Sequence, residues 1–172
     1  MPRDWDAYYS DPANIKRNPH PLLVQVAELL PPGRALDLAC GAGRNALYLA
    51  SLGWQVTAVD SSAVALAQLR GVETHLADLE KHQFAIAPAA YDLICDFHYL
   101  QRDLFAAIRE GVRPGGVFTG AIHLATPGHS EVFSLQPGEL REEFRGWKIP
   151  YYSESPEPQS TRFSARIIAR RA

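Results

Sequence analysis

Two glycines and four acids are the residues whose types and spacing could do chemistry in this sequence. Gly41 and Gly43 follow a short apolar segment, Arg34–Ala39, and precede a run with helical spacing. A glycine turn between a strand and a helix opens backbone N–H groups to a ligand at the strand's carboxyl end. The acids near segment ends are Asp37, Asp60, Asp78 and Asp96. The pattern therefore predicts a cofactor site around the glycine turn.

Asp37 is the unusual member because it stands inside the apolar segment. A strand covered by helices on both faces should be almost wholly apolar, and an unpaired buried carboxylate is costly. The run Gly41-Ala-Gly-Arg-Asn-Ala46, with Asp60 nineteen residues after Gly41, also fits a dinucleotide fingerprint. Asp37 would repel a pyrophosphate but attract an ammonium group. The glycines alone leave both cofactors open, and Asp37 favours S-adenosylmethionine, which carries an ammonium group.

The elements that must position these residues alternate between strand and helix. The predicted strands are 34–39, 54–60, 72–77, 91–96 and 117–123. The predicted helices are 21–30, 44–52, 104–112 and one that Ser61 or Ser62 caps and that runs through Leu69. Such alternation predicts an α/β fold, a Rossmann-like three-layer sandwich with a mostly parallel sheet. Right-handed crossovers bring the strands' carboxyl ends, and hence the acids, to one edge.

Two stretches depart from this alternation. Residues 81–90, which include Pro88, predict a loop that is too short and irregular for a full crossover helix. Segments 147–152 and 163–169 predict a C-terminal antiparallel hairpin at the sheet edge. Arg113-Pro-Gly-Gly116 predicts a tight turn before the strand at 117–123.

Length and composition predict one soluble domain over 1–172, with an N-terminal arm at 1–20, a cofactor-binding core at 34–123 and C-terminal edge strands at 124–172. The chain has 172 residues, a hydrophobic content of 47% and a net charge of −2. This charge gives no reason to bind nucleic acid or acidic membranes. No signal peptide or apolar run of about 20 residues is evident, so we expect a cytoplasmic protein, monomeric or homodimeric.

Cysteine and histidine spacing predicts neither a disulfide nor a metal site. Cys40 and Cys95 fall near the ends of predicted strands, where we expect reduced thiols without a redox role. The six histidines show none of the spacings that metal ligands use.

Several motifs in order resemble the class I S-adenosylmethionine-dependent methyltransferases. The resemblance covers about 34–123 and is far more specific than the glycines alone. Its motifs are Leu36-Asp-Leu-Ala-Cys-Gly-Ala-Gly43, Val56-Thr-Ala-Val-Asp-Ser61, Ala77-Asp-Leu79, Tyr91-Asp-Leu-Ile-Cys-Asp96 and Arg113-Pro-Gly-Gly-Val-Phe118. Within that family the chain is similar to the small tellurite-resistance-type methyltransferases. The features behind this are Trp5 to Tyr9, Gly43-Arg-Asn-Ala46, Pro137-Gly-Glu-Leu140 and Gly146-Trp147.

For the cofactor, chemistry and resemblance together give each residue an expected role. Asp37 would bind the amino group, directly or through water, and Asp60 would accept hydrogen bonds from both ribose hydroxyls. The resemblance implies that Asp78-Leu79 meets the adenine and that Asp96-Phe97 lines the mouth of the active site. Trp5 and Tyr9 either anchor the arm or close over the cofactor. The full set of expected contacts is Trp5, Tyr9, Asp37, Ala39, Cys40, Gly41, Gly43, Asp60, Ser61, Asp78, Leu79, Asp96 and Phe97.

For the methyl acceptor, the candidates are His98, Tyr99, His123 and Arg102, which follow the fourth and fifth predicted strands. A thiolate or a metalloid oxyanion could react without a base. An oxygen or nitrogen nucleophile would need one, and His98, then His123, is the candidate. Arg102 is a candidate contact to a small-molecule substrate. The alternative is that His98 and Arg102 only cap the next helix or face solvent.

Two other classes of function stay open. A nicotinamide-dependent oxidoreductase would bind NAD(H) at the same glycines, and Asp37 disfavours it. A cofactor-sensing protein would keep the pocket and turn nothing over. Nucleic-acid methylation is disfavoured because no basic groove is evident in the sequence.

Overall fold

The contacts of the chain fall into two units, residues 1–85 and 86–172, which are described in turn. The structure is a computed structural model, and it describes residues 4–126, 132–157 and 162–172. The first three residues of the expected N-terminal arm, with parts of the C-terminal segment, lie outside the described residues.

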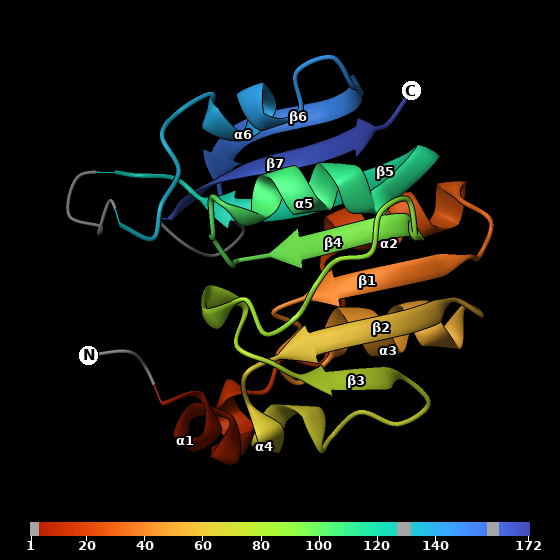
Figure 1. Ribbon diagram of the computed structural model, residues 1–172. Helices are drawn as coiled ribbons and strands as arrows, with labels where there is room; N and C mark the ends of the chain where they lie inside the picture. Colours follow the sequence, from red (N-terminus) through yellow and green to blue (C-terminus); the bar gives the residue numbers. More distant parts are fainter. Residues whose placement is uncertain (1–3, 127–131, 158–161) are drawn as a thin grey trace. The chain divides into compact units, whose positions relative to one another are not determined.

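The first unit is built on three parallel strands in the order β3-β2-β1 (Figure 1). Its elements are α1 (Trp5–Ser10), η1 (Pro12–Asn14), α2 (Pro21–Leu29), β1 (Arg34–Leu38), α3 (Arg44–Ser51), β2 (Gln55–Asp60), α4 (Ala63–Leu66), β3 (Glu73–Leu76) and η2 (Leu79–Lys81). In the β1–β2 register, Asp37 pairs with Ala58. In the β2–β3 register, Asp60 pairs with Leu76 at the carboxyl end.

The helices of this unit begin where the sequence offers capping groups. Ser62 caps α4, and its hydroxyl accepts a hydrogen bond from Ala65 N–H at 3.0 Å. Pro21 occupies the first turn of α2, where its missing N–H costs nothing. Gly43 stands before α3 with φ of +77°, a left-handed conformation that glycine adopts without strain.

The second unit has a parallel pair followed by an antiparallel pair, in the order β4-β5-β7-β6 (Figure 1). Its elements are β4 (Tyr91–Phe97), α5 (Leu104–Gly111), β5 (Val112–His123), α6 (Glu139–Glu143), β6 (Lys148–Pro156) and β7 (Phe163–Arg170). Strand β7 runs antiparallel to both neighbours, and its Ser164 pairs with His123. The prediction of mostly parallel strands with a C-terminal antiparallel hairpin is therefore confirmed.

An aromatic cluster centred on Phe144 fills the core of this unit. The Phe144 ring stacks on Phe118 with centroids 4.5 Å apart, and meets Phe105 and Trp147 edge-on at 6.3 and 5.2 Å. Phe144 follows α6, which the sequence analysis did not predict. This cluster fixes α6 against the sheet.

Three local features refine the predictions. The arm carries no long regular element, as expected, but Trp5–Ser10 forms a short helix because Asp4 caps it. Residues 81–90 contain no α-helix, which confirms the missing crossover helix. The turn at 113–116 lies inside β5 as an irregularity, where the pairing shifts between Tyr91 and Leu93. No helix in the described part of the chain is long and apolar enough to span a bilayer.

Candidate functional site

Asp60, at the end of β2, joins the glycine turn to the start of α4. Its Oδ2 accepts a hydrogen bond from Gly41 N–H at 2.8 Å, and its Oδ1 accepts one from Ser62 N–H at 2.9 Å. Burial raises the pKa of this carboxyl, while the backbone hydrogen bonds oppose that rise. Each carboxylate oxygen has more than one lone pair, so Asp60 can still accept hydrogen bonds from a vicinal diol.

The glycine turn is in a conformation that brings its backbone close to other groups. Gly41 has φ of +55° and Gly43 has φ of +77°. A Cβ on Gly41 would overlap the Tyr9 hydroxyl, and a Cβ on Gly43 would lie 2.6 Å from Leu69 Cγ. Ala39, just before the turn, is also left-handed, with φ of +49°. Unlike glycine, Ala39 is strained in this conformation, and such backbone strain persists only where the surroundings fix it, as at ligand sites.

The N-terminal arm is held in two places. Its carboxylate contacts the start of α4, and its aromatic residues cover the glycine turn. Asp6 accepts a hydrogen bond from the Ser62 hydroxyl at 2.6 Å and one from Val64 N–H at 3.1 Å. These contacts place α1 beside α4 (Figure 1). Tyr9 reaches Gly41, and the Trp5 ring stacks on Tyr9 at 6.1 Å while staying 41% exposed. Asp6 was not predicted from the sequence, although Ser61 or Ser62 was expected to cap the helix that follows.

Asp37 is buried in β1, with 1% of its surface exposed. Its charge reaches the glycine turn: burial, and then the carboxylates of Asp37 and Asp60, raise the pKa of the Cys40 thiol. Cys40 is therefore a neutral thiol at physiological pH and a poor nucleophile. Cys40 and Cys95 are both free cysteines.

Asp78 and Leu79 form the turn after β3. Asp78 caps η2 by accepting from Glu80 N–H at 3.1 Å, and it pairs with Lys81 at 2.9 Å. The hydrogen bond from Lys81 lowers the pKa of Asp78, which keeps it ionised. Leu79 is buried. The expected adenine contact of this turn stays a prediction.

In the second unit, the end of β4 carries Asp96, Phe97 and His98. Asp96 and Phe97 are buried. His98 is left-handed with φ of +71°, and its N–H donates to Ala121 O at 2.7 Å. This conformation turns the His98 ring onto His123, at the end of β5, with centroids 4.9 Å apart. The two histidines proposed from the sequence therefore lie together within this unit.

The other two acceptor candidates are engaged in local contacts. Tyr99 donates its hydroxyl hydrogen to Gln101 Oε1 at 2.6 Å. Arg102 makes a bidentate pair with Glu139, at 2.5 and 3.0 Å, and donates to Ser134 O at 3.0 Å. This ion pair raises the pKa of Arg102 and lowers that of Glu139. Arg102 thus holds the start of α6, and a role in binding substrate stays a prediction.

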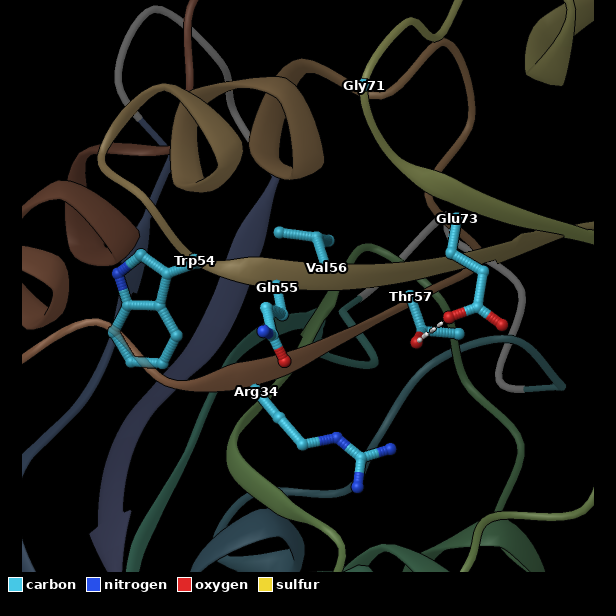
Figure 2. A pocket seen from close by; sticks show the side chains of 7 residues that line it. All are labelled: Arg34, Trp54, Gln55, Val56, Thr57, Gly71 and Glu73. Atoms are coloured by element: carbon cyan, nitrogen blue, oxygen red, sulfur yellow. Dashed lines mark hydrogen bonds between the residues drawn. The ribbon is translucent and has the colours of Figure 1, made fainter.

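A polar pocket of about 580 Å³ lies at the amino ends of β1 and β2, whereas Asp60 stands at the carboxyl end of β2. Its lining includes Arg34, Gln55, Thr57 and Glu73, and the Thr57 hydroxyl donates to Glu73 at 3.3 Å (Figure 2). Polar side chains of this kind are suited to contact with water. The pocket is therefore distinct from the predicted cofactor site.

Comparisons with known proteins agree with these features. The family model described as tellurite resistance protein TehB matches residues 3–158. A probable S-adenosyl-L-methionine-dependent methyltransferase TehB of Haemophilus influenzae is 27% identical over 161 residues, which cover 79% of this chain and 53% of the relative. Hemagglutinin 1 of Eikenella corrodens is 30% identical over 152 residues, which cover 79% of this chain and 51% of the relative. The chain thus spans about half the length of the curated relatives it matches.

Solved structures show the same fold. The crystal structure of TehB from Haemophilus influenzae has a TM-score of 0.78 and 25% identity, covering 98% of this chain and 67% of that one. A Burkholderia thailandensis 1,6-didemethyltoxoflavin-N1-methyltransferase, solved with S-adenosylhomocysteine bound, has a TM-score of 0.64 and 20% identity, covering 88% of this chain and 79% of that one.

The chain has a Rossmann-like α/β architecture, the fold of the solved TehB from Haemophilus influenzae and of an S-adenosylmethionine-dependent methyltransferase from Mesorhizobium loti. The match to the family model covers most of the chain. The chain belongs to the tellurite resistance protein TehB family.

Proposed function

We propose that this protein, as a single domain over 1–172, transfers the methyl group of S-adenosylmethionine to a small-molecule acceptor. The observation that carries the proposal is the buried carboxylate of Asp60, which accepts from Gly41 N–H and Ser62 N–H at the end of β2. The membership of the TehB family and the names of the relatives support the same cofactor.

The residues of the first unit fit this cofactor. Asp60 has lone pairs left for the two ribose hydroxyls, which are the vicinal diol of the cofactor. The buried Asp37 offers a negative charge for the amino group. Gly41 and Gly43 let Tyr9 and Leu69 pack directly on the turn, which holds its backbone in the left-handed conformation beside Asp60. When bound, S-adenosylmethionine would supply an electrophilic methyl group on a positively charged sulfur.

The remaining expected contacts divide into backbone and side-chain roles. Ala39, Cys40 and Ser61 would contribute backbone groups, since the Cys40 thiol is neutral and half-buried and Ser61 is exposed. Trp5 and Tyr9 would cover the cofactor from the arm. In the second unit, we assign Asp96 and Phe97 to the mouth of the site, as implied by the family resemblance.

On the acceptor side, the protein would act by holding the nucleophile in line with the methyl group, which can supply much of the rate. His98, Tyr99, His123 and Arg102 remain the candidate residues. The tellurite named in the family description makes a metalloid oxyanion one candidate acceptor, and a thiol or a small protic metabolite is another.

Calorimetric titration with S-adenosylmethionine and with NAD(H) tests the cofactor. We expect saturable binding of S-adenosylmethionine, and Asp60→Ala should weaken it by about 10- to 150-fold, because a charge-assisted hydrogen bond contributes roughly 1.5–3 kcal/mol. Glu73→Gln is the matched control, since Glu73 is a carboxylate of the same unit at the opposite strand ends. The proposal is wrong if NAD(H) binds in place of S-adenosylmethionine, or if Asp60→Ala binds as tightly as wild type.

The sensing alternative makes a separate prediction. A cofactor sensor would bind S-adenosylmethionine but would release no S-adenosylhomocysteine with any acceptor in a panel of thiols, metalloid oxyanions and small metabolites. Catalysis predicts release above the background with at least one of them.

A further inference from the structure

Four side chains form a row in the second unit, where β4 and β5 end beside the β6–β7 hairpin. Glu157 Oε1 lies 3.8 Å from His98 Nδ1. The His98 ring stacks on the His123 ring at an interplanar angle of 26°. His123 Nδ1 lies 3.1 Å from Ser164 Oγ. The order of the row is thus Glu157, His98, His123 and Ser164.

The backbone holds this row in place at both ends. His98 is fixed by its N–H bond to Ala121 O, and its left-handed conformation is uncommon for a residue with a side chain. Glu157 is fixed by its own N–H, which donates to Arg162 O at 2.7 Å. Ser164 is fully buried and pairs with His123 in the β5–β7 register. Strain that is held in this way concentrates at functional sites.

The chemistry of the row assigns a tautomer to His98. A carboxylate beside Nδ1 favours the form in which that nitrogen carries the hydrogen, and the lone pair then lies on Nε2. The same carboxylate stabilises the imidazolium that forms when Nε2 takes a proton. His123 stacks on the ring and limits its rotation. A separation of 3.8 Å is longer than a hydrogen bond, but such contacts in catalytic sites often shorten when the substrate binds.

We propose that Glu157 is a positioning residue that orients His98 as a general base, and that the methyl acceptor is therefore a neutral oxygen or nitrogen nucleophile that carries a proton. The inference rests on the proposed methyl transfer and names its class of acceptor. A metalloid oxyanion would attack through a lone pair on the metalloid, which carries no proton, so the row would be idle with it.

The methyl transfer and the proton transfer to His98 conserve atoms and electrons. A lone pair of the acceptor oxygen or nitrogen forms the bond to the methyl carbon, and the carbon–sulfur bond breaks with its electrons going to sulfur. His98 Nε2 takes the proton of the acceptor, and Glu157 faces the imidazolium that results. The proton then leaves to solvent, and His98 returns to its neutral form.

Nitrogen-15 NMR of the histidine side chains tests the positioning without any acceptor. We expect His98 to carry its hydrogen on Nδ1 in the neutral wild-type protein. Glu157→Leu should remove that preference, and Glu157→Gln, which keeps an oxygen acceptor, should restore part of it. The control Glu143→Gln breaks a comparable ion pair with Arg109 in the same unit and should leave the His98 signals unchanged. A wild-type His98 with its hydrogen on Nε2 would overturn the positioning role.

Turnover with defined probes tests the class of acceptor. The probes are catechol and aniline as protic acceptors and sodium tellurite as the oxyanion, with release of S-adenosylhomocysteine as the readout. We expect turnover with a protic probe, a kcat reduced about 100-fold by Glu157→Leu with KM within about twofold, and partial recovery in Glu157→Gln. Turnover confined to tellurite, no turnover with either protic probe, or an equal loss in Glu143→Gln would overturn the inference.

The two proposals fail separately. If S-adenosylmethionine does not bind in the calorimetric titration, the proposed function is wrong, whatever the NMR spectra show. If it binds and a protic probe is methylated at the same rate by wild type and Glu157→Leu, the methyltransferase function stands and the role of Glu157 falls.

Discussion

Replacing Gly41 with alanine adds a methyl group between the glycine turn and the tyrosine that covers it. Gly41 has φ of +55°, and its added Cβ would overlap the Tyr9 hydroxyl and lie 2.9 Å from Tyr9 Cζ. The Tyr9 ring must therefore move. Because this ring packs on Trp5 and Tyr8, with centroids 6.1 and 5.1 Å away, its movement loosens the arm.

The free energy of unfolding should fall by about 2–5 kcal/mol. A left-handed backbone costs an alanine about 1–2 kcal/mol relative to glycine, and aromatic pairs contribute about 0.5–1.5 kcal/mol each beyond their buried area. The backbone penalty arises when alanine replaces any left-handed glycine, whereas the loss of aromatic packing arises only if the arm covers the turn as described.

Gly71→Ala is the matched control, because it separates the two costs. Gly71 has φ of +72°, and a Cβ there would meet no atom of the described residues within 4 Å. We expect Gly71→Ala to lose only about 1–2 kcal/mol in urea denaturation. Combining Gly41→Ala with Tyr9→Ala should cost less than the sum of the single changes, since the clash is already relieved.

The same variants separate stability from cofactor binding. Gly41→Ala should lower the affinity for S-adenosylmethionine at least tenfold in calorimetry, and Gly71→Ala should bind S-adenosylmethionine as tightly as wild type does. The reasoning is refuted if Gly41→Ala and Gly71→Ala lose the same free energy of unfolding, or if the double variant shows full additivity with Tyr9→Ala.

Three further predictions follow from charges and packing. Burial raises the pKa of Asp60. As the pH is lowered, the affinity for S-adenosylmethionine should therefore begin to fall at a higher pH than about 4, where an exposed aspartate titrates. Asp60→Asn should flatten that pH profile. The Ser62 hydroxyl lowers the pKa of Asp6. The docking of the arm should therefore be stable above the ordinary aspartate range and be lost as the pH falls through the lowered pKa. The indole N–H signal of Trp5 in NMR checks this, and Asp6→Asn should be undocked at every pH. Phe144→Ala should destabilise the protein by about 3–5 kcal/mol in urea denaturation, because Phe144 is fully buried at the centre of the aromatic cluster, and a loss below about 1 kcal/mol would contradict that role.

The cofactor half of the site was predictable because its signals are local. Gly41 and Gly43 lie next to the strand and the helix that they connect, and Asp60 ends the following strand. The parallel order of β1, β2 and β3 then follows from connections that are short and right-handed. The structure confirms the elements and brings Gly41 and Asp60 into hydrogen-bonding contact, while the bound cofactor itself stays a proposal.

The remaining features could not be read from the sequence because they depend on contacts between distant residues. Asp6 binds Ser62 across 56 positions, and His123 meets Ser164 across 41. A single acid in a polar arm, or a serine in a C-terminal strand, carries no signal by itself. The helix α6 was missed because it is only five residues long and is held by the Phe144 cluster rather than by its own pattern.

The same distinction explains why the acceptor is harder to infer than the cofactor. His98 follows β4 and could be named from the sequence, but its proposed partner Glu157 follows β6, at the far end of the second unit's strand order. In the proposed role, the Glu157 carboxylate decides which nitrogen of the imidazole is free to take a proton. The carboxylate lies near His98 only because β7 runs antiparallel between β5 and β6. A change in the β6–β7 hairpin can therefore alter acceptor chemistry while leaving the glycine turn, Asp37 and Asp60 intact. Members of this family that share those cofactor motifs are expected to differ in acceptor according to the residue at the Glu157 position.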